Sequence, residues 1–152
     1  MAGTYFQIYI QFVFAVKGRQ NLLHSQWRNE VFMYMAGIIR AKGAKPIIVN
    51  GVEDHVHVFV GLKPSTCPSD LVRDVKNGSS KFINEHGWIP GKFCWQEGYG
   101  AFSYSQSHID NVYRYIGNQE QHHQKQTFKE EYLELLQKFE VDYEEKFLFD
   151  WG

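Results

Sequence analysis

Residues 44–62 read AKPIIVNGVEDHVHVFVGL, two strand-like segments joined by a short polar turn. The segments Ala44–Asn50 and His55–Leu62 are rich in β-branched and apolar side chains, and the loop between them has the length of a hairpin connection. Because successive side chains of a strand point to opposite faces, His55 and His57 are expected side by side on one face, with the valines beside them directed into the core. The stretch therefore predicts a β-hairpin with two histidines on one face.

The remaining strand and helix signals complete the fold plan. Strands are predicted over Thr4–Val16 and Lys92–Gln96. Helices are predicted from Ser25 to about Lys42, from Ser69 to about His86, from His108 to about Gln124, and over Phe128–Phe139. The order β-α-β-β-α-β followed by helices predicts an α+β chain with the ferredoxin-like, or split βαβ, fold. Its four-stranded, mainly antiparallel sheet is expected to carry two helices on one face, to leave the other face free, and to be followed by C-terminal helices.

Length and composition predict one globular domain. The chain has 152 residues, of which 43% are hydrophobic and 16% aromatic, so it can bury a core and does not belong to the disordered class. The domain is expected to span residues 1–140, with residues 141–152 as an acidic and aromatic tail. Cys67 and Cys94 lack CxxC spacing, no signal peptide is visible, and the apolar stretches are too short to cross a bilayer. These features predict a cytoplasmic protein.

The charge is distributed unevenly. A net charge of −1 argues against a nucleic-acid partner, but residues 129–152 hold eight acidic side chains against three lysines. Residues 1–128 are left with 13 basic and 9 acidic side chains, so an acidic tail follows a mildly basic body. Candidates for contact with a phosphate backbone lie in turns and helices of that body: Lys17, Arg19, Arg73, Lys76 and Lys81. The alternative is that each of them is an ordinary solvated charge.

The histidine pair has the clearest chemical meaning. Two imidazoles on one strand face can bind one divalent metal ion, which needs at least one further protein ligand. Gln119, on the third predicted helix, is the candidate, because a glutamine oxygen suits a hard ion such as Mg²⁺ or Mn²⁺. Tyr115 lies four residues earlier on the same helix face, where its hydroxyl could reach a phosphorus atom held by the ion. The alternative is a pair of surface histidines on a half-exposed strand.

Neighbouring residues leave further alternatives open. Tyr113 is a competing nucleophile, but it lies on the other side of the helix from Tyr115 and is expected to join the apolar stripe. His122 and His123 could add metal ligands or phosphate contacts, although adjacent helix residues do not share a face. Asp54 could join the metal site or serve only as the turn residue.

Taken in order, these residues resemble the single-tyrosine HUH transposases encoded by small insertion sequences that move as single-stranded DNA. HUH denotes two histidines around a hydrophobic residue, which here stand in EDHVHVFV at residues 53–60. The other matching blocks are IYIQFVFAVKGR at residues 8–19, WQEGYGAFS at 95–103, and YIGNQ at 115–119 followed by His122-His123 and Thr127-Phe128. The resemblance covers about residues 4–135. One HUH triplet is a weak signal, but the HUH triplet, the aromatic and glycine-rich block at 95–103 and the Tyr-x-x-x-Gln helix in that order are together highly specific.

The resemblance implies an enzyme, a DNA strand transferase and nuclease that depends on Mg²⁺ or Mn²⁺. By this resemblance His55, His57 and Gln119 are the metal ligands, and Tyr115 is the nucleophile that forms a 5′-phosphotyrosine intermediate. The implied substrate is single-stranded DNA with hairpins near the element ends. The implied assembly is a homodimer with composite active sites, in which the tyrosine helix of one subunit faces the histidines of the other. Gly98–Gly100 is then expected in the connector to that helix.

Two residues depart from the family pattern. Gln11 stands where a histidine is expected in many relatives, and Tyr104 replaces a small or aliphatic residue. Neither is expected to touch the catalytic set, although both affect the expected DNA specificity. The acidic tail is not explained by the motif match.

Three rival functions are weighed against the transposase reading. The main one is a non-catalytic or domesticated relative that only binds hairpin DNA, which has no reason to retain all four of His55, His57, Tyr115 and Gln119. A histidine-triad nucleotide hydrolase requires a third histidine at the position of Phe59. A purely structural protein does not account for three ordered motif blocks.

Overall fold

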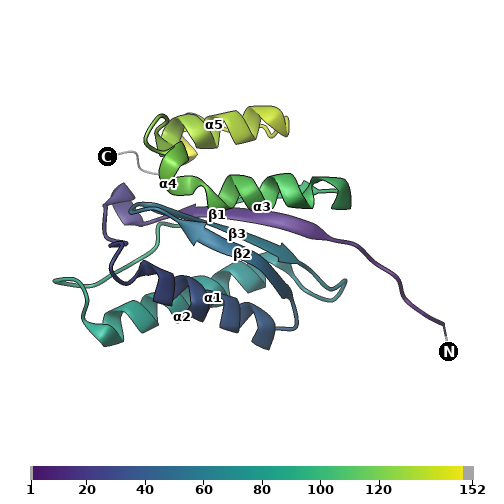
Figure 1. The fold of residues 1–152 in the computed structure, drawn as a ribbon, viewed down its shortest axis with the longest axis horizontal. Coiled ribbons are helices and arrows are strands. Elements are labelled where there is room, and N and C mark those ends of the chain that lie inside the picture. Colours follow the sequence, from purple (N-terminus) through teal and green to yellow (C-terminus); the bar gives the residue numbers. More distant parts are fainter. Residues whose placement is uncertain (1, 149–152) are drawn as a thin grey trace.

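The computed structural model describes residues 2–148 and shows a four-stranded antiparallel sheet in the order β2-β3-β1-β4 (Figure 1). The strands are β1 (Tyr9–Ala15), β2 (Lys45–Gly51), β3 (His55–Gly61) and β4 (Gly100–Tyr104). Because β3 lies between β1 and β2 and both faces of the sheet are covered, its residues 55–60 are all buried. The predicted α+β class and ferredoxin-like strand order are confirmed.

One face of the sheet is covered by α1 (Arg28–Ala41) and α2 (Pro68–His86), which lie beneath it in Figure 1. Phe12 and Val58 are opposite one another in the β1–β3 ladder and point toward these helices. They form the main apolar core together with helix residues such as Met35 and Val72. The valines of β3 thus occupy the core face, as predicted, and the histidines take the other.

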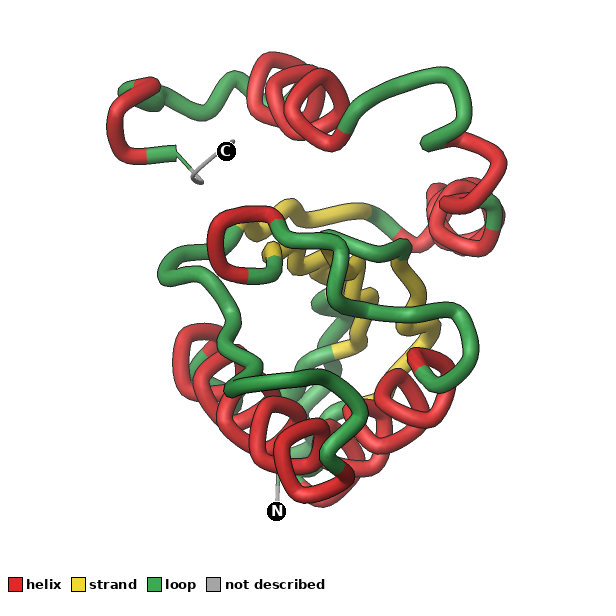
Figure 2. The backbone as a smooth tube through the Cα atoms, turned by 90° about the vertical axis from the view of Figure 1, so that its left-hand side faces the viewer, coloured by secondary structure: helices red, strands yellow, loops and turns green. Residues whose placement is uncertain are grey.

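That other face is not free, as the sequence had suggested, but is covered by the C-terminal helices (Figures 1 and 2). These are α3 (Ile109–Gly117), α4 (Gln119–His122) and α5 (Phe128–Lys138). Phe59 shares the histidine face and packs against Val112 and Ile116 of α3 in a second apolar cluster. The ring of Phe128, at the start of α5, stacks on His55 with ring centroids 4.0 Å apart. Apolar groups on both faces of β3 therefore give the sheet two covering layers.

The fourth strand was predicted in the wrong place. Residues 92–96 form only an isolated bridge between Trp95 and Val16, and β4 begins after them, at Gly100. Trp95 is buried edge-on against Phe14, with ring centroids 4.9 Å apart, so the apolar alternation there reflects core packing more than the short pairing of residues 94–96 with the end of β1. The glycine block leads into β4 and not into a helix. A Cβ on Gly100 would lie 2.9 Å from the hydroxyl of Tyr132 and 2.9 Å from the ring of Phe102, so a larger residue there would have to displace these side chains.

Several element boundaries also differ from the predicted ones. β1 begins at Tyr9, later than expected, and α1 begins at Arg28 and not at Ser25. Arg28 is buried and forms ion pairs with two glutamates, a tertiary arrangement that the apolar periodicity does not reveal. The third predicted helix is divided at Asn118 into α3 and α4. α5 begins as predicted at Phe128, after a capping box.

Among the described residues, no helix is both long and apolar enough to span a membrane. Of the predicted C-terminal tail, residues 149–152 lie outside the described part of the chain. Residues 145–147 form a single 3-10 turn.

Candidate metal and tyrosine site

His55 and His57 project from β3 into the layer between the sheet and the C-terminal helices. Both are fully buried, at 0% exposure, which excludes a pair of surface histidines. His55 Nδ1 donates to Asp54 Oδ1 at 2.7 Å, and His57 Nδ1 donates to Gln11 Oε1 at 2.6 Å. Such hydrogen bonds orient an imidazole and leave Nε2 free to bind a metal. Asp54 therefore belongs to the site, and so does Gln11, contrary to the expectation that it would not touch the catalytic set.

Tyr104, the second departure from the family pattern, contacts the site through Gln11. Gln11 is itself 0% exposed, and its Nε2 donates to the hydroxyl oxygen of Tyr104 at 2.8 Å. The amide is therefore held at both ends, between Tyr104 and His57. Because Gln11 is fixed in this way, it can keep the His57 ring in one orientation.

The two Nε2 atoms face the carboxylate of Glu131, a residue of α5 that is 1% exposed. Glu131 Oε1 lies 3.3 Å from His55 Nε2 and 3.1 Å from His57 Nε2. His123 Nε2 lies 2.9 Å from the same oxygen. His122 Nε2 is buried and lies 3.3 Å from Oε2 without forming a hydrogen bond. One buried carboxylate thus gathers imidazoles from β3 and from the end of α4.

Gln119 is brought to the same place, as the sequence predicts. Its side chain is 0% exposed, and its Oε1 lies 3.2 Å from His55 Nε2. Its Nε2 donates to Glu131 Oε2 at 3.0 Å. The amide therefore presents an oxygen to the histidine pair while it holds the carboxylate.

These side chains fit a divalent metal ion. His55, His57, His123 and Glu131 each offer a ligand atom, and the four atoms lie within 4.8 Å of one another. Imidazole nitrogens combined with a carboxylate oxygen form a donor set that suits ions such as Mn²⁺, Fe²⁺ and Zn²⁺. The Nδ1 hydrogen bonds of His55 and His57 are the outer partners that metal-binding histidines usually have. The cluster can therefore hold a metal, and its chemistry does not select one ion.

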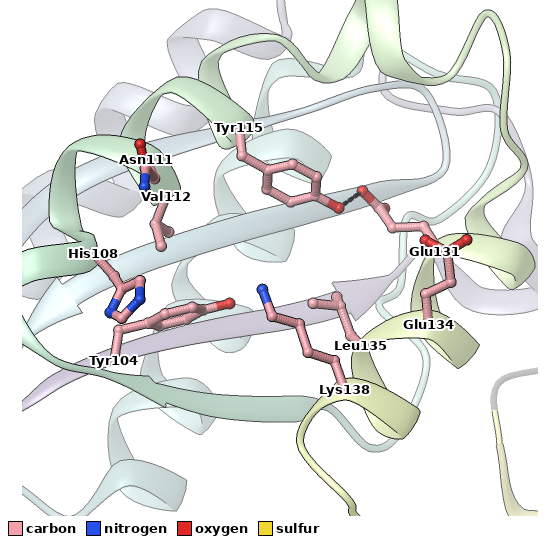
Figure 3. A pocket seen from close by; sticks show the side chains of 9 residues that line it. All are labelled: Tyr104, His108, Asn111, Val112, Tyr115, Glu131, Glu134, Leu135 and Lys138. Atoms are coloured by element: carbon pink, nitrogen blue, oxygen red, sulfur yellow. Dashed lines mark hydrogen bonds between the residues drawn. The ribbon is translucent and has the colours of Figure 1, made fainter.

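Tyr115 lies against this cluster, whereas Tyr113 does not. The Tyr115 hydroxyl donates a short hydrogen bond to Glu131 Oε2 (Figure 3). The Tyr115 ring centroid lies 5.9 Å from that of His57. Tyr113 is 50% exposed and is not part of the apolar side of α3, so the expectation that it would join the apolar stripe is wrong. The apolar residues that fasten α3 to the sheet are Val112 and Ile116, and this arrangement turns Tyr115 toward the histidines.

Burial and charge shift the pKa values of the cluster. Burial alone would lower the pKa of His55, but hydrogen bonds and charges from Asp54 and Glu131 outweigh it and raise the pKa to about 9. Burial lowers the pKa of His57. The imidazoles, His57 first, overcome burial and hold the pKa of Glu131 well below its usual range. Burial, and after it the charge of Glu131, raises the pKa of Tyr115 well above its ordinary value. In the metal-free cluster the carboxylate is therefore charged and the tyrosine is neutral.

A pocket of about 340 Å³ opens beside Tyr115, between α3 and α5 (Figure 3). Tyr115 and Glu131 form one part of its lining, and Lys138 and Tyr104 form another. Figure 3 shows the amino group of Lys138 pointing into this space. A ligand can therefore approach Tyr115 from the side of the protein that carries α5.

Three of the basic residues predicted to contact DNA, Arg73, Lys76 and Lys81, lie on α2, on the opposite face of the sheet from this cluster. Lys17 is exposed, and the side chain of Arg19 lies outside the described part of the structure. Arg73 forms exposed ion pairs with aspartates of α2, and Lys81 pairs with Glu85 at 3.9 Å. The ammonium of Lys76 donates to the backbone oxygens of Gln96 and Gly98 at 2.8 and 2.7 Å, and burial lowers its pKa to about 8. Lys76 thus holds the loop before β4.

Sequence reasoning missed Glu131 and misjudged Gln11. A signal existed for each, because both are polar residues on otherwise apolar faces. Glu131 lies beside Phe128, Tyr132 and Leu135 on the buried side of α5. Gln11 interrupts a buried strand. Such residues are buried only when a polar partner satisfies them, so each pointed to an interior site.

The similarity to solved structures indicates the class of protein to which this fold belongs. Among solved structures, the chain is similar to a candidate transposase from Deinococcus radiodurans R1, with a TM-score of 0.63 and 20% identity over 78% of this chain and 95% of that one. It is also similar to a REP-associated tyrosine transposase bound to a REP hairpin, with a TM-score of 0.60 and 13% identity over 81% of this chain and 73% of that one. At these identities the likeness establishes a shared fold, the fold of transposase structures.

The match of the sequence to a protein family identifies the family of the chain. Residues 4–119 match the family described as "Transposase IS200 like", and the chain belongs to that family. The matched region contains the histidine pair, Tyr115 and Gln119, and it ends before His123 and Glu131. No curated protein sequence matches the chain significantly.

Proposed function

We propose that the protein is a metal-dependent transposase that cleaves and rejoins single-stranded DNA at hairpin-bearing element ends. The observation that carries the proposal is the meeting of Tyr115 with His55, His57 and Gln119 in one buried cluster, although they come from separate elements. Membership of the IS200-like transposase family supports the same conclusion.

In this proposal Tyr115 is the nucleophile. Its hydroxyl is neutral at physiological pH, because burial raises its pKa, so it needs help to attack phosphorus. A divalent ion such as Mg²⁺ or Mn²⁺, when bound here, polarises the scissile phosphate and neutralises the charge that develops on it. His55 and His57 would hold the ion, and Gln119 would add an oxygen ligand. The hydrogen bonds to the two Nδ1 atoms keep the imidazoles in position.

The strand transfer consists of two exchanges at one phosphorus atom. In the first, the Tyr115 oxygen forms a bond to phosphorus while the bond to the 3′-oxygen of the preceding nucleotide breaks. The tyrosine gives up its proton and the released 3′-oxygen gains one. In the second, the 3′-hydroxyl of another strand attacks the 5′-phosphotyrosine and restores Tyr115. Because the phosphodiester energy is kept in the protein–DNA link, the reaction requires neither a nucleoside triphosphate nor net hydrolysis.

The surroundings of Tyr115 support a nucleic-acid strand as the substrate. The pocket beside it is open, and Lys138 supplies a cation to the lining. A related structure holds a REP hairpin, which supports a folded hairpin as the recognised form of DNA. Among the candidate phosphate contacts, Lys17, Arg73 and Lys81 are exposed, so they are available to a DNA backbone.

The expected assembly depends on whether one chain or two chains supply the residues of the active site. The resemblance implies a homodimer in which the tyrosine helix crosses to the partner subunit. In this structure, however, Tyr115 contacts Glu131 and lies beside His57 of its own chain, on an α3 that is packed against its own sheet. These contacts favour an active site formed within one chain, and a homodimer then brings together two such sites.

A covalent-adduct assay tests the proposal. Wild-type protein is incubated with single-stranded DNA bearing a terminal hairpin and Mn²⁺, and a protein–DNA adduct is sought by denaturing gel and mass spectrometry. We expect an adduct on Tyr115, its loss in Tyr115→Phe, and its retention in Tyr113→Phe, the matched control on the exposed side of α3. An adduct that persists in Tyr115→Phe would falsify the assignment of the nucleophile.

The second candidate function is hairpin binding without catalysis. The hairpin held by the REP-associated transposase favours it, because that ligand requires only binding. Wild-type protein that binds hairpins tightly but forms no adduct with any divalent ion supports this alternative.

A further inference from the structure

Glu131 is a buried carboxylate that several polar side chains contact. It is 1% exposed, and it accepts hydrogen bonds from Tyr115 and Gln119 while three imidazoles lie close to its Oε1. Burying a carboxylate is costly unless a positive charge compensates it. Glu131 comes from α5, beyond residue 119, where the family match ends.

The hydrogen bonds of the two strand histidines show that a positive charge is needed beside Glu131. His55 and His57 each donate from Nδ1, to Asp54 and Gln11. In the neutral form, their Nε2 atoms therefore carry lone pairs. Those lone pairs face a carboxylate oxygen at 3.3 and 3.1 Å. An acceptor that faces an acceptor at this distance is repelled unless a cation lies between them, so the arrangement requires protons or a metal ion.

The separations also match those of neighbouring ligands around one ion. Two ligands that each lie about 2.1 Å from an ion are roughly 3.0–3.4 Å apart in octahedral or tetrahedral geometry. Glu131 Oε1 lies 2.9 to 3.3 Å from the Nε2 atoms of His123, His57 and His55. Only small movements of these side chains are needed to admit an ion.

We propose that Glu131 is a ligand of the metal ion and the stronger of its two oxygen ligands. A carboxylate carries a full negative charge, whereas the Gln119 amide is neutral and binds hard cations more weakly. Gln119 Nε2 donates to Glu131 Oε2, which leaves Oε1 directed at the histidines. The amide thus positions the carboxylate in addition to offering its own oxygen. The inference rests on the metal site of the proposed function, but not on DNA cleavage.

This assignment makes α5 part of the active site. The ion then joins β3 to α5 through His55, His57 and Glu131, across the layer that holds Tyr115. Because Tyr115 also donates to Glu131, the residue that binds the ion also positions the nucleophile. Metal binding is therefore expected to slow amide hydrogen exchange in α5, whether or not DNA is present.

The test is the affinity for Mn²⁺ of the full-length protein without DNA, measured by calorimetry and by electron paramagnetic resonance. We expect Glu131→Gln to weaken binding by more than the roughly 10–100-fold that loss of an outer-shell partner costs. Gln119→Ala is expected to weaken it less. Glu85→Gln, which removes an exposed carboxylate from α2 on the opposite face of the sheet, is the control and should leave the affinity unchanged.

Two outcomes overturn the inference. One is a loss of affinity in Glu131→Gln no larger than the roughly 10–100-fold that loss of an outer-shell partner costs, and the other is a larger loss in Gln119→Ala than in Glu131→Gln. If Glu131→Gln does not fold, Glu131→Asp restores a carboxylate. A fall in its affinity and retention of metal-dependent protection of α5 support the proposal, and wild-type affinity or no protection refutes it. Wild-type protein that binds Mn²⁺ but forms no DNA adduct refutes only the proposed function, so the two failures are distinguishable.

Discussion

Replacing Ile116 by alanine tests whether the packing of α3 on the sheet places Tyr115. Ile116 is 0% exposed and lies with Val112 against Phe59 of β3, in the apolar cluster that fastens α3 to the histidine face. Truncation of a fully buried isoleucine removes its apolar contacts and leaves a cavity. The expected cost is about 2–5 kcal/mol of the free energy of unfolding. Because Tyr115 is the adjacent residue, we expect it to move when the surrounding structure relaxes into this cavity.

The effect on activity is expected to exceed the effect on folding. A displacement of a reacting group by about 1 Å can cost roughly 100-fold in rate. The measurements are urea denaturation and single-turnover formation of the DNA adduct, the latter at a temperature where the variant is fully folded. The matched control is Ile83→Ala on α2, which is also 0% exposed but belongs to the main core on the opposite face. Its loss of stability should be similar, and its adduct rate should stay close to wild type.

Either of two results contradicts this prediction. If the two folded variants lose the same fraction of the adduct rate, the α3 cluster has no special role in positioning Tyr115. If Ile116→Ala loses stability but reacts at the wild-type rate, then Tyr115 is placed by other contacts, of which its hydrogen bond to Glu131 is the first candidate.

Three further predictions concern assembly, pH and DNA contacts. Mixing equal amounts of Tyr115→Phe and His57→Ala should restore no adduct if each site lies within one chain, whereas recovery toward about a quarter of the wild-type rate would show that the tyrosine acts on the partner subunit. In metal-free protein the pKa of His55 is raised to about 9, so protonation of His55 stabilises the fold fully below about pH 6.5. Urea titrations should therefore show the free energy of unfolding declining as the pH rises from 6.5 toward about 9. A flat pH profile contradicts this. Arg73→Ala should reduce by about one the slope of the logarithm of hairpin affinity against the logarithm of salt concentration. Lys76→Ala should instead lower the stability of the protein, because the Lys76 ammonium is hydrogen-bonded to the loop before β4. Equal slopes for Arg73→Ala and wild type would remove Arg73 from the DNA contacts.

Local sequence signals were sufficient wherever the information lay within one element. The alternation in residues 55–60 placed the two histidines on one strand face. The spacing of Tyr115 and Gln119 indicated that they would lie close together, although the helix divides at Asn118 and they belong to α3 and α4. The order of elements predicted the ferredoxin-like sheet, and the helical pattern from Phe128 predicted the start of α5. These features depend on backbone periodicity, which neighbouring residues determine.

Features that depend on distant partners could not be obtained in this way. The alternating residues 92–96 were taken for a strand because burial against Phe14 produces the same pattern as strand pairing. The covering of the histidine face required knowledge that Phe59 meets Ile116, which lies far along the chain. Both errors concern which surface an apolar residue is buried against, and periodicity does not report that.

The histidine pair, its strand and the Tyr115–Gln119 spacing were determined by the sequence itself. Only the tertiary structure decided that Gln11 and Glu131 belong to the same cluster, since residues from β1, β3, α4 and α5 meet there. The physical reason is the cost of burying polar groups. A glutamine in a strand and a glutamate on an apolar helix face each need a partner, and long-range packing alone determines which partner each one meets.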